Sequence, residues 1–203
     1  EFFRSDADID HCFFLQRILI ESKCSLPSNC GKSYYVNFQL NNMSATISNI
    51  KVARLPKRLL ACVTHVGPYK ENPQLFEGLF KKVIAWAAPK GLMQNPDLEA
   101  ISVYHDDPDE VPEDQHRICV GFTVPMGTPT NEDITLLDLP EGKYVIGEFE
   151  ILPNEYGKAW SLMYDFIKDQ NLRQGKVMYE SYKNDPHAHP EGKHVVDICV
   201  AIE

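Results

Sequence analysis

Glu180 is the residue whose type and neighbours most clearly suggest ligand chemistry. It lies in the run from about 176 to 182, which predicts a strand. Because alternate residues of a strand point to the same face, Glu180 shares a face with Met178 and Tyr182. A carboxylate among aromatic rings suits a cationic or amphipathic organic ligand, since charge pairing and cation–π contact act together. A second interpretation also fits, in which Glu180 is a solvated or locally paired residue at a strand edge.

Aromatic residues supply most of the other candidate contacts. Tyr104 and Tyr182 each precede an Asp-Pro turn, so each either lines a binding site or serves the turn itself. Tyr156 and Trp160 lie on a predicted helix, where aromatic residues belong either to the core or to a binding site. The full set of expected ligand-binding residues is Glu180, Tyr182, Tyr104, Trp160, Tyr156, Ser102 and Phe149.

Histidines close together in the sequence raise the question of a metal site. His187, His189 and His194 fall within eight residues, yet metal ligands also need convergent geometry and supporting hydrogen bonds. His116 and His194 flank equivalent turns, which favours a structural role. The motifs typical of nucleotide binding, serine hydrolases and zinc proteases do not occur in a supporting context. We therefore expect no metal and no cofactor.

An internal repeat places these residues. At an offset of 78 residues, Tyr104 to Val124 and Tyr182 to Ile202 share six of 21 positions, including the Tyr, the Asp-Pro and the His. The same offset makes Ser102 the counterpart of Glu180, because 102 + 78 = 180. Upstream, Leu55-Pro56 recurs as Leu139-Pro140. Only one side of an approximate two-fold axis therefore carries the carboxylate.

Each copy shows the same order of strand and helix signals. The first copy predicts a strand over 58–66 and a helix after Asn72-Pro73, with apolar residues at helical spacing and Gly91 at its end. Two strands follow, near 100–105 and 116–124. The second copy predicts a strand over 143–151, a helix over about 154–170, and strands near 176–182 and 194–202. The predicted fold is α+β, a duplicated strand-helix-strand-strand unit whose antiparallel sheet is covered by two helices.

The predicted domain covers residues 51–203, with repeats at about 51–125 and 135–203. Residues 1–50 lie outside the repeat, and we expect a helix over 6–23 followed by a Ser- and Asn-rich linker, a remnant of a longer regulator. The net charge of 20 − 29 = −9 and the lack of a basic cluster argue against direct contact with nucleic acid. The longest apolar stretch near the N-terminus is too short and too polar for a membrane span. Six cysteines without a CxxC pair indicate a reduced, cytoplasmic setting.

Several motifs occur together in the order typical of one known family. They are LPKRLLACVTHVGPY (residues 55–69), YHDDP (104–108), LPEGKYVIGEFEI (139–151), EYGKAW (155–160) and YKNDPHAHPEGKHVVDICV (182–200). Together they resemble the GyrI-like small-molecule-binding domain, above all the C-terminal effector-binding domain of bacterial AraC-type transcription regulators. The resemblance implies a ligand groove along the two-fold axis, and it places the acidic residue of the family's ExY segment at Glu180, with the tyrosine at Tyr182.

The sequence therefore predicts a ligand-sensing module of a transcription regulator, with DNA binding left to a part outside this chain. Two alternatives remain. One is a GyrI-like hydrolase, in which Glu180 with Tyr104 or Trp160 polarises a water molecule. The other is a protein module that acts on DNA gyrase.

Overall fold

The computed structural model describes residues 46–203, apart from residues 109, 131 and 132. The predicted helix over 6–23 lies outside these residues. The strands are β1 (Thr46–Leu55), β2 (Arg58–Val66), β3 (Ala100–Tyr104), β4 (Arg117–Val124), β5 (Thr135–Leu139), β6 (Gly142–Ile151), β7 (Gln174–Tyr182) and β8 (His194–Ile202). The α-helices in the described part are α2 (Pro73–Ala87) and α3 (Tyr156–Asp169).

The strands form one eight-stranded antiparallel sheet in the order β1-β6-β8-β7-β3-β4-β2-β5. The two copies of the repeat, β2-α2-β3-β4 and β6-α3-β7-β8, meet where β3 pairs with β7. At that junction Ser102 lies opposite Glu180. Because these two residues are repeat equivalents, the approximate two-fold axis passes between them. The α+β fold with a duplicated unit is confirmed.

The outermost strands are exchanged between the two copies. β1 precedes β2 in the chain but pairs with β6, and β5 precedes β6 but pairs with β2. The expected linker includes residues 46–50, and no strand is expected at β5. Both are edge strands, so each lacks the continuous apolar run that marks the inner strands. The sheet begins at Thr46, five residues before the predicted boundary.

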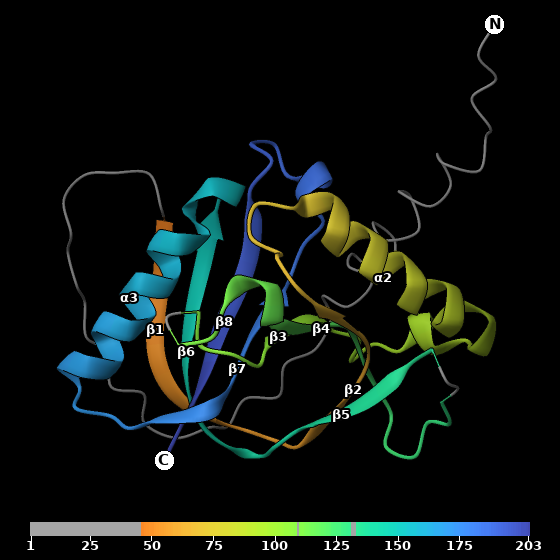
Figure 1. Cartoon of the computed structure of the whole chain (residues 1–203), viewed down its shortest axis with the longest axis horizontal. Helices are drawn as coiled ribbons and strands as arrows, with labels where there is room; N and C mark the ends of the chain where they lie inside the picture. Colours follow the sequence, from red (N-terminus) through yellow and green to blue (C-terminus); the bar gives the residue numbers. More distant parts are fainter. Residues whose placement is uncertain (1–45, 109, 131–132) are drawn as a thin grey trace, which may run out of the picture.

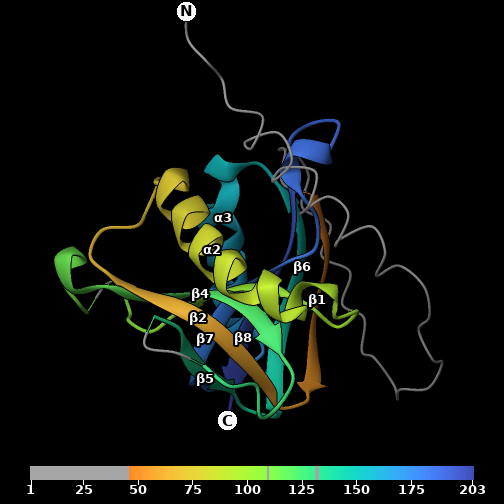
Figure 2. The same ribbon diagram turned by 90° about the vertical axis from the view of Figure 1, so that its right-hand side faces the viewer.

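The two helices begin and end for identifiable local reasons. The side chain of Asn72 accepts a hydrogen bond from the backbone N–H of Leu75, and Pro73 occupies the first turn, as expected for a helix start. α2 ends at Ala87, just before Pro89, and a short 3-10 turn separates it from Gly91. α3 follows a 3-10 turn at Pro153–Glu155. Figure 1 and Figure 2 show both helices on the same side of the sheet, one over each copy.

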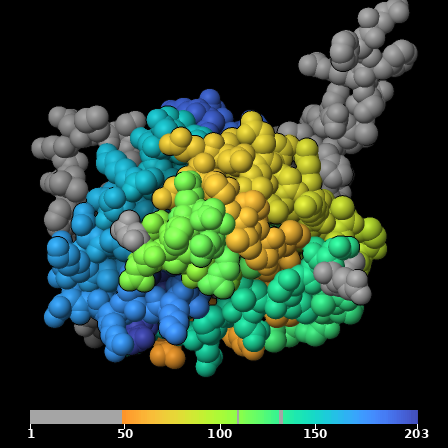
Figure 3. Space-filling model, in the orientation of Figure 1, coloured from red at the N-terminus to blue at the C-terminus, as the bar shows by residue number. Residues whose placement is uncertain are grey.

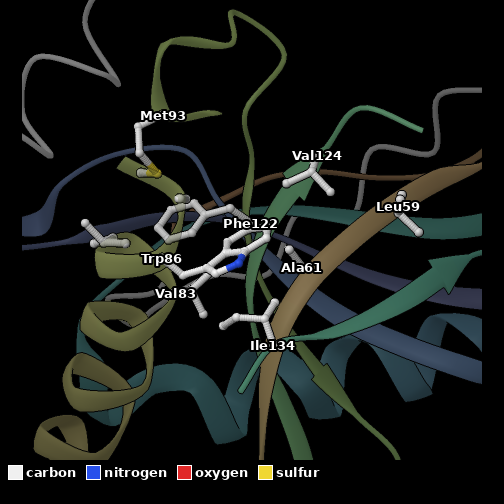
Figure 4. Close-up of a cluster of buried hydrophobic side chains, with 10 residues drawn as sticks. Leu59, Ala61, Val83, Trp86, Met93, Phe122, Val124 and Ile134 are labelled. Carbon is white, nitrogen blue, oxygen red and sulfur yellow. The ribbon is translucent and has the colours of Figure 1, made fainter. Parts of the chain in front are cut away.

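Each helix covers its own hydrophobic cluster. Beneath α2, Val83 and Trp86 pack with Phe122 and Met93 (Figure 4). Beneath α3, the cluster consists of Val145, Phe149, Ile151, Ala159, Met163, Ile167, Met178, Val196, Ile198 and Val200. A third cluster lies on the opposite face of the sheet and includes Leu60, Ile101 and Tyr179. The helices are therefore held firmly, which keeps their facing side chains in place over β3 and β7.

The helices of the described region are too short to cross a bilayer as continuous apolar spans.

Candidate functional site

Glu180 lies on β7, one of the two middle strands of the sheet, and is only 3% exposed. Its carboxylate accepts three hydrogen bonds. Trp160 Nε1 donates to Oε1 at 2.7 Å, while the hydroxyls of Tyr104 and Tyr182 donate to Oε2 at 2.9 and 2.7 Å. The interpretation of Glu180 as a solvated residue is therefore wrong. A carboxylate has about four acceptor positions, so one on Oε1 remains open.

Tyr182 links Glu180 to its repeat counterpart. The Tyr182 hydroxyl also lies 3.1 Å from Oγ of Ser102, which is fully buried. A hydroxyl has one proton, and a charged acceptor makes the stronger hydrogen bond, so Tyr182 donates to Glu180 and accepts from Ser102. Ser102 thus holds the Tyr182 hydroxyl in the orientation that serves the carboxylate.

Burial controls the titration of this cluster. Desolvation raises the pKa of Glu180, and the hydrogen bonds from Trp160, Tyr182 and Tyr104 offset part of that rise. Desolvation, reinforced by the charge of Glu180, raises the pKa of Tyr104 and of Tyr182 well above the ordinary value. Both hydroxyls therefore stay protonated and remain donors at physiological pH. Among the described residues, no Lys, Arg or His pairs with Glu180.

Aromatic rings from both copies surround the carboxylate. Tyr104 meets Trp160 edge-on at 5.7 Å between ring centroids, and Tyr182 meets Phe80 edge-on at 6.0 Å. These two pairs are related by the two-fold axis, and each joins a strand of one copy to the helix of the other. Unlike Glu180, the rings are partly exposed. Partly exposed aromatic rings thus surround a buried carboxylate, a setting in which charge pairing and cation–π contact can act together.

The structure brings most of the predicted site residues together. Glu180, Tyr182, Tyr104, Trp160 and Ser102 form one hydrogen-bonded cluster. Tyr156 lies four residues before Trp160 on α3, and its hydroxyl is 2.7 Å from Nδ1 of His194.

Phe149 lies elsewhere. It is 1% exposed in the core beneath α3, on β6, and β8 separates that strand from β7. This position favours a packing role, and no ring contact or hydrogen bond joins Phe149 to Glu180 among the described residues.

Sequence reasoning missed two rings of the site, Phe80 and Tyr69. Tyr69 lies in the connection between β2 and α2 and contacts Tyr104 at 5.6 Å. Its helical spacing alone predicts Phe80 as part of the apolar face of α2. Extending the repeat to the helices would have found it, because Pro73 and Pro153 are 80 residues apart and the same offset pairs Phe80 with Trp160.

Comparison with known proteins identifies the family of this domain. Residues 48–203 match the family described as GyrI-like small molecule binding domain. The chain belongs to this family. DNA gyrase inhibitor 2 of Dickeya dadantii (strain 3937) is 29% identical over 134 residues, which cover 64% of this chain and 82% of that protein. The DNA gyrase inhibitor of Citrobacter rodentium (strain ICC168) is 26% identical over 161 residues, covering 76% and 97%.

Solved structures share the fold of this GyrI-like domain at low sequence identity. The C-terminal domain of EcmrR has a TM-score of 0.60 at 13% identity and covers 76% of this chain and 97% of its own. SAV2435, solved bound to tetraphenylphosphonium, has a TM-score of 0.51 at 11% identity and covers 76% and 94%. Likeness at this identity concerns the fold alone.

Proposed function

We propose that this GyrI-like domain binds an aromatic organic cation, with Glu180 as the counter-ion. The observation that carries the proposal is a buried carboxylate without a cationic partner, beneath partly exposed rings. Burying an unpaired charge is costly, so such a residue in the free protein is stabilised by a ligand that brings the opposite charge. A quaternary cation needs no hydrogen bond from Glu180, and the donors that hold the carboxylate can stay in place.

Titration calorimetry with a charged and a neutral ligand tests the proposal. Tetraphenylphosphonium, which SAV2435 binds, and the neutral triphenylphosphine oxide provide the pair. We expect Glu180→Gln to weaken binding of the cation by roughly 10- to 100-fold and that of the neutral compound by far less. Glu191→Gln, an exposed change near the β7–β8 turn, serves as the control. Equal losses for the two ligands, or no binding of the cation by the wild type, would contradict the proposal.

For the biological role, the comparisons favour a protein module that acts on DNA gyrase over a module of a transcription regulator. The two curated relatives above are named DNA gyrase inhibitors, and the matched region covers most of each. Two weaker observations support the regulator interpretation. They are the resemblance in sequence motifs and the likeness of fold to the C-terminal domain of EcmrR. We therefore infer that the chain acts on DNA gyrase. The test is a supercoiling assay with purified gyrase and increasing amounts of the chain, run with and without tetraphenylphosphonium. Unchanged supercoiling at a large molar excess would reject this role, and the expected lack of direct DNA affinity stays a prediction.

The hydrolase alternative has one observation in its favour. Glu180, Tyr104 and Trp160 do converge, and the open acceptor position on Oε1 could hold a water molecule. Turnover of an electrophilic small molecule that disappears in Glu180→Gln, with binding retained, would support hydrolysis. Binding of the same compound without turnover would support a binding module.

A further inference from the structure

His116 carries a buried nitrogen without a hydrogen-bond partner. The side chain is 3% exposed, and Nδ1 has no partner among the described residues. Its other nitrogen, Nε2, lies 2.8 Å from the carbonyl oxygen of Val111. A carbonyl only accepts, so Nε2 carries the proton and Nδ1 of the neutral ring is a bare acceptor. A buried acceptor left unpaired costs stability, and most are satisfied in folded proteins.

The second copy of the repeat satisfies the equivalent nitrogen. Nδ1 of His194, 78 residues further on, lies 2.7 Å from the hydroxyl of Tyr156. The helices correspond at an offset of 80, and the buried pairs Leu79/Ala159 and Val83/Met163 keep that offset. The counterpart of Tyr156 is therefore Phe76, because 156 − 80 = 76. Phe76 lacks the hydroxyl, which explains why His116 has no partner.

The unpaired nitrogen lies at the end of a row of rings that starts at the carboxylate. Tyr104 donates to Glu180, Tyr69 contacts Tyr104 at 5.6 Å between centroids, and His116 contacts Tyr69 at 5.7 Å. Phe76 also contacts Tyr69, edge-on at 6.4 Å between centroids. Figure 3 shows the green segment that follows β3 on the face drawn there, between the halves that carry α2 and α3.

We propose that Nδ1 of His116 accepts a hydrogen bond from a hydroxyl or N–H group of the ligand. The inference rests on the proposed cation site and narrows its ligand class to aromatic cations that carry a donor at a distance from the charge. His116 and Glu180 are both buried, so a ligand reaches them by displacing rings, and Tyr69 is a partly exposed ring in contact with His116. The two copies then recognise different parts of the ligand. Glu180 pairs with its positive charge, and His116 accepts a hydrogen bond from its donor group.

Two isosteric cations test the proposal. One is triphenylphosphonium with a 4-(hydroxymethyl)phenyl group, and the other carries 4-ethylphenyl in its place. Phe76→Tyr provides His116 with the internal hydroxyl that Tyr156 gives to His194. We expect this variant to lower the affinity for the alcohol, relative to the ethyl compound, by roughly 2- to 10-fold. The matched control Phe166→Tyr adds a hydroxyl to α3, the helix of the other copy, and should leave that ratio unchanged.

Each outcome of the titrations decides a different point. If wild type binds neither cation, the proposed cation site itself is wrong. If wild type binds both and Phe76→Tyr leaves the affinity ratio unchanged, the cation site stands and the role of His116 is overturned. A ratio that falls equally in Phe166→Tyr also overturns it, because the added hydroxyl would then act without reference to His116.

Discussion

At the residue scale, the two copies of the repeat differ in polarity around one axis. Glu180 and Ser102 face each other across the β3–β7 junction, and Trp160 and Phe80 are counterparts on the helices. The carboxylate and the indole N–H that stabilises it therefore occur in the same copy. A substitution at either Glu180 or Trp160 alters the ionisation of the site. The pH dependence of stability and of binding therefore tests the role of both residues.

The difference in stability between a Glu180→Gln variant and wild type should change with pH in a defined direction. Burial raises the pKa of Glu180 in the folded chain, so the folded state binds its proton more tightly than the unfolded state does. The stability that this group contributes is present at low pH and declines as pH rises above about 4.3, the ordinary value for Glu. Gln does not titrate. The free energy of unfolding of the variant, minus that of wild type, should therefore increase between pH 4 and pH 7.

Urea unfolding at several pH values measures that difference. Glu191→Gln is the control, and its difference from wild type should change with pH in the opposite direction. The reason is that hydrogen bonding and charge pairing with Lys193 lower the pKa of Glu191. Its effect should be small, since Glu191 is exposed. A difference between Glu180→Gln and wild type that stays constant across the range would contradict the assignment of Glu180 as a buried carboxylate with a raised pKa.

Trp160→Phe should shift the pH dependence of cation binding. The indole N–H stabilises the charged carboxylate, so its removal raises the pKa of Glu180 further. Binding of tetraphenylphosphonium needs the charged form, and its midpoint should move to higher pH. Trp86→Phe, a change in the core beneath α2, is the matched control and should leave the midpoint in place. Affinity that falls by the same factor at every pH would mean that Trp160 contributes only its ring face.

At the element scale, close approach between β2 and β4 and the packing of the helices hold the site in shape. Gly121 pairs with Cys62 in adjacent strands, and a Cβ at position 121 would overlap the carbonyl oxygen of Ala61. The obstacle is backbone in a paired strand, which cannot rotate away. α2 contacts these same two strands, so a distortion there reaches the helix that carries Phe76 and Phe80.

Alanine at two glycines should therefore have opposite effects on stability. Gly121→Ala forces β2 and β4 apart and should cost at least about 3 kcal/mol, the upper end for overpacking. Gly78→Ala lies on the exposed side of α2 with open space around it, and should stabilise the fold by about 0.5–1 kcal/mol. Urea denaturation of the two variants measures both changes. A neutral or stabilising Gly121→Ala would contradict the backbone overlap at position 121, and a destabilising Gly78→Ala would contradict the open space around position 78.

At the scale of the whole molecule, exchange of the edge strands ties the two copies together. β1 belongs to the first copy in sequence but completes the sheet of the second, and β5 does the reverse. Neither copy can therefore keep its full sheet without the other. Lys51 on β1 also pairs with Glu148 on β6 across this edge.

Two truncations test how the domain is bounded. A chain of residues 46–203 retains every strand of the sheet and should unfold in one cooperative transition. A chain of residues 56–203 lacks β1, exposes the edge of β6, and should be clearly less stable. Thermal unfolding followed by circular dichroism compares the two. Loss of a cooperative transition in the longer chain, or equal stability of both, would show that the boundary lies elsewhere.

The sequence by itself determined the repeat, most element bounds and the central candidate of the site. β2 and β8 run over the predicted residues, and α2 begins at Pro73 after its predicted cap. These features depend on local signals: hydrophobic periodicity, turn residues and helix caps act over a few residues and can be read from neighbours. Glu180 was found because the repeat contrasts it with Ser102.

Only the tertiary structure decided which distant residues meet. The exchange of β1 and β5, the ring pairs across the axis and two of the donors on Glu180, Trp160 and Tyr104, arise from contacts between residues at least 20 positions apart. Phe149 shows the limit: its strand was predicted, but the sheet order places β8 between it and the site. The unpaired nitrogen of His116 likewise appears only once α2 is placed over the sheet, because burial and partnership depend on what the rest of the chain brings to each atom.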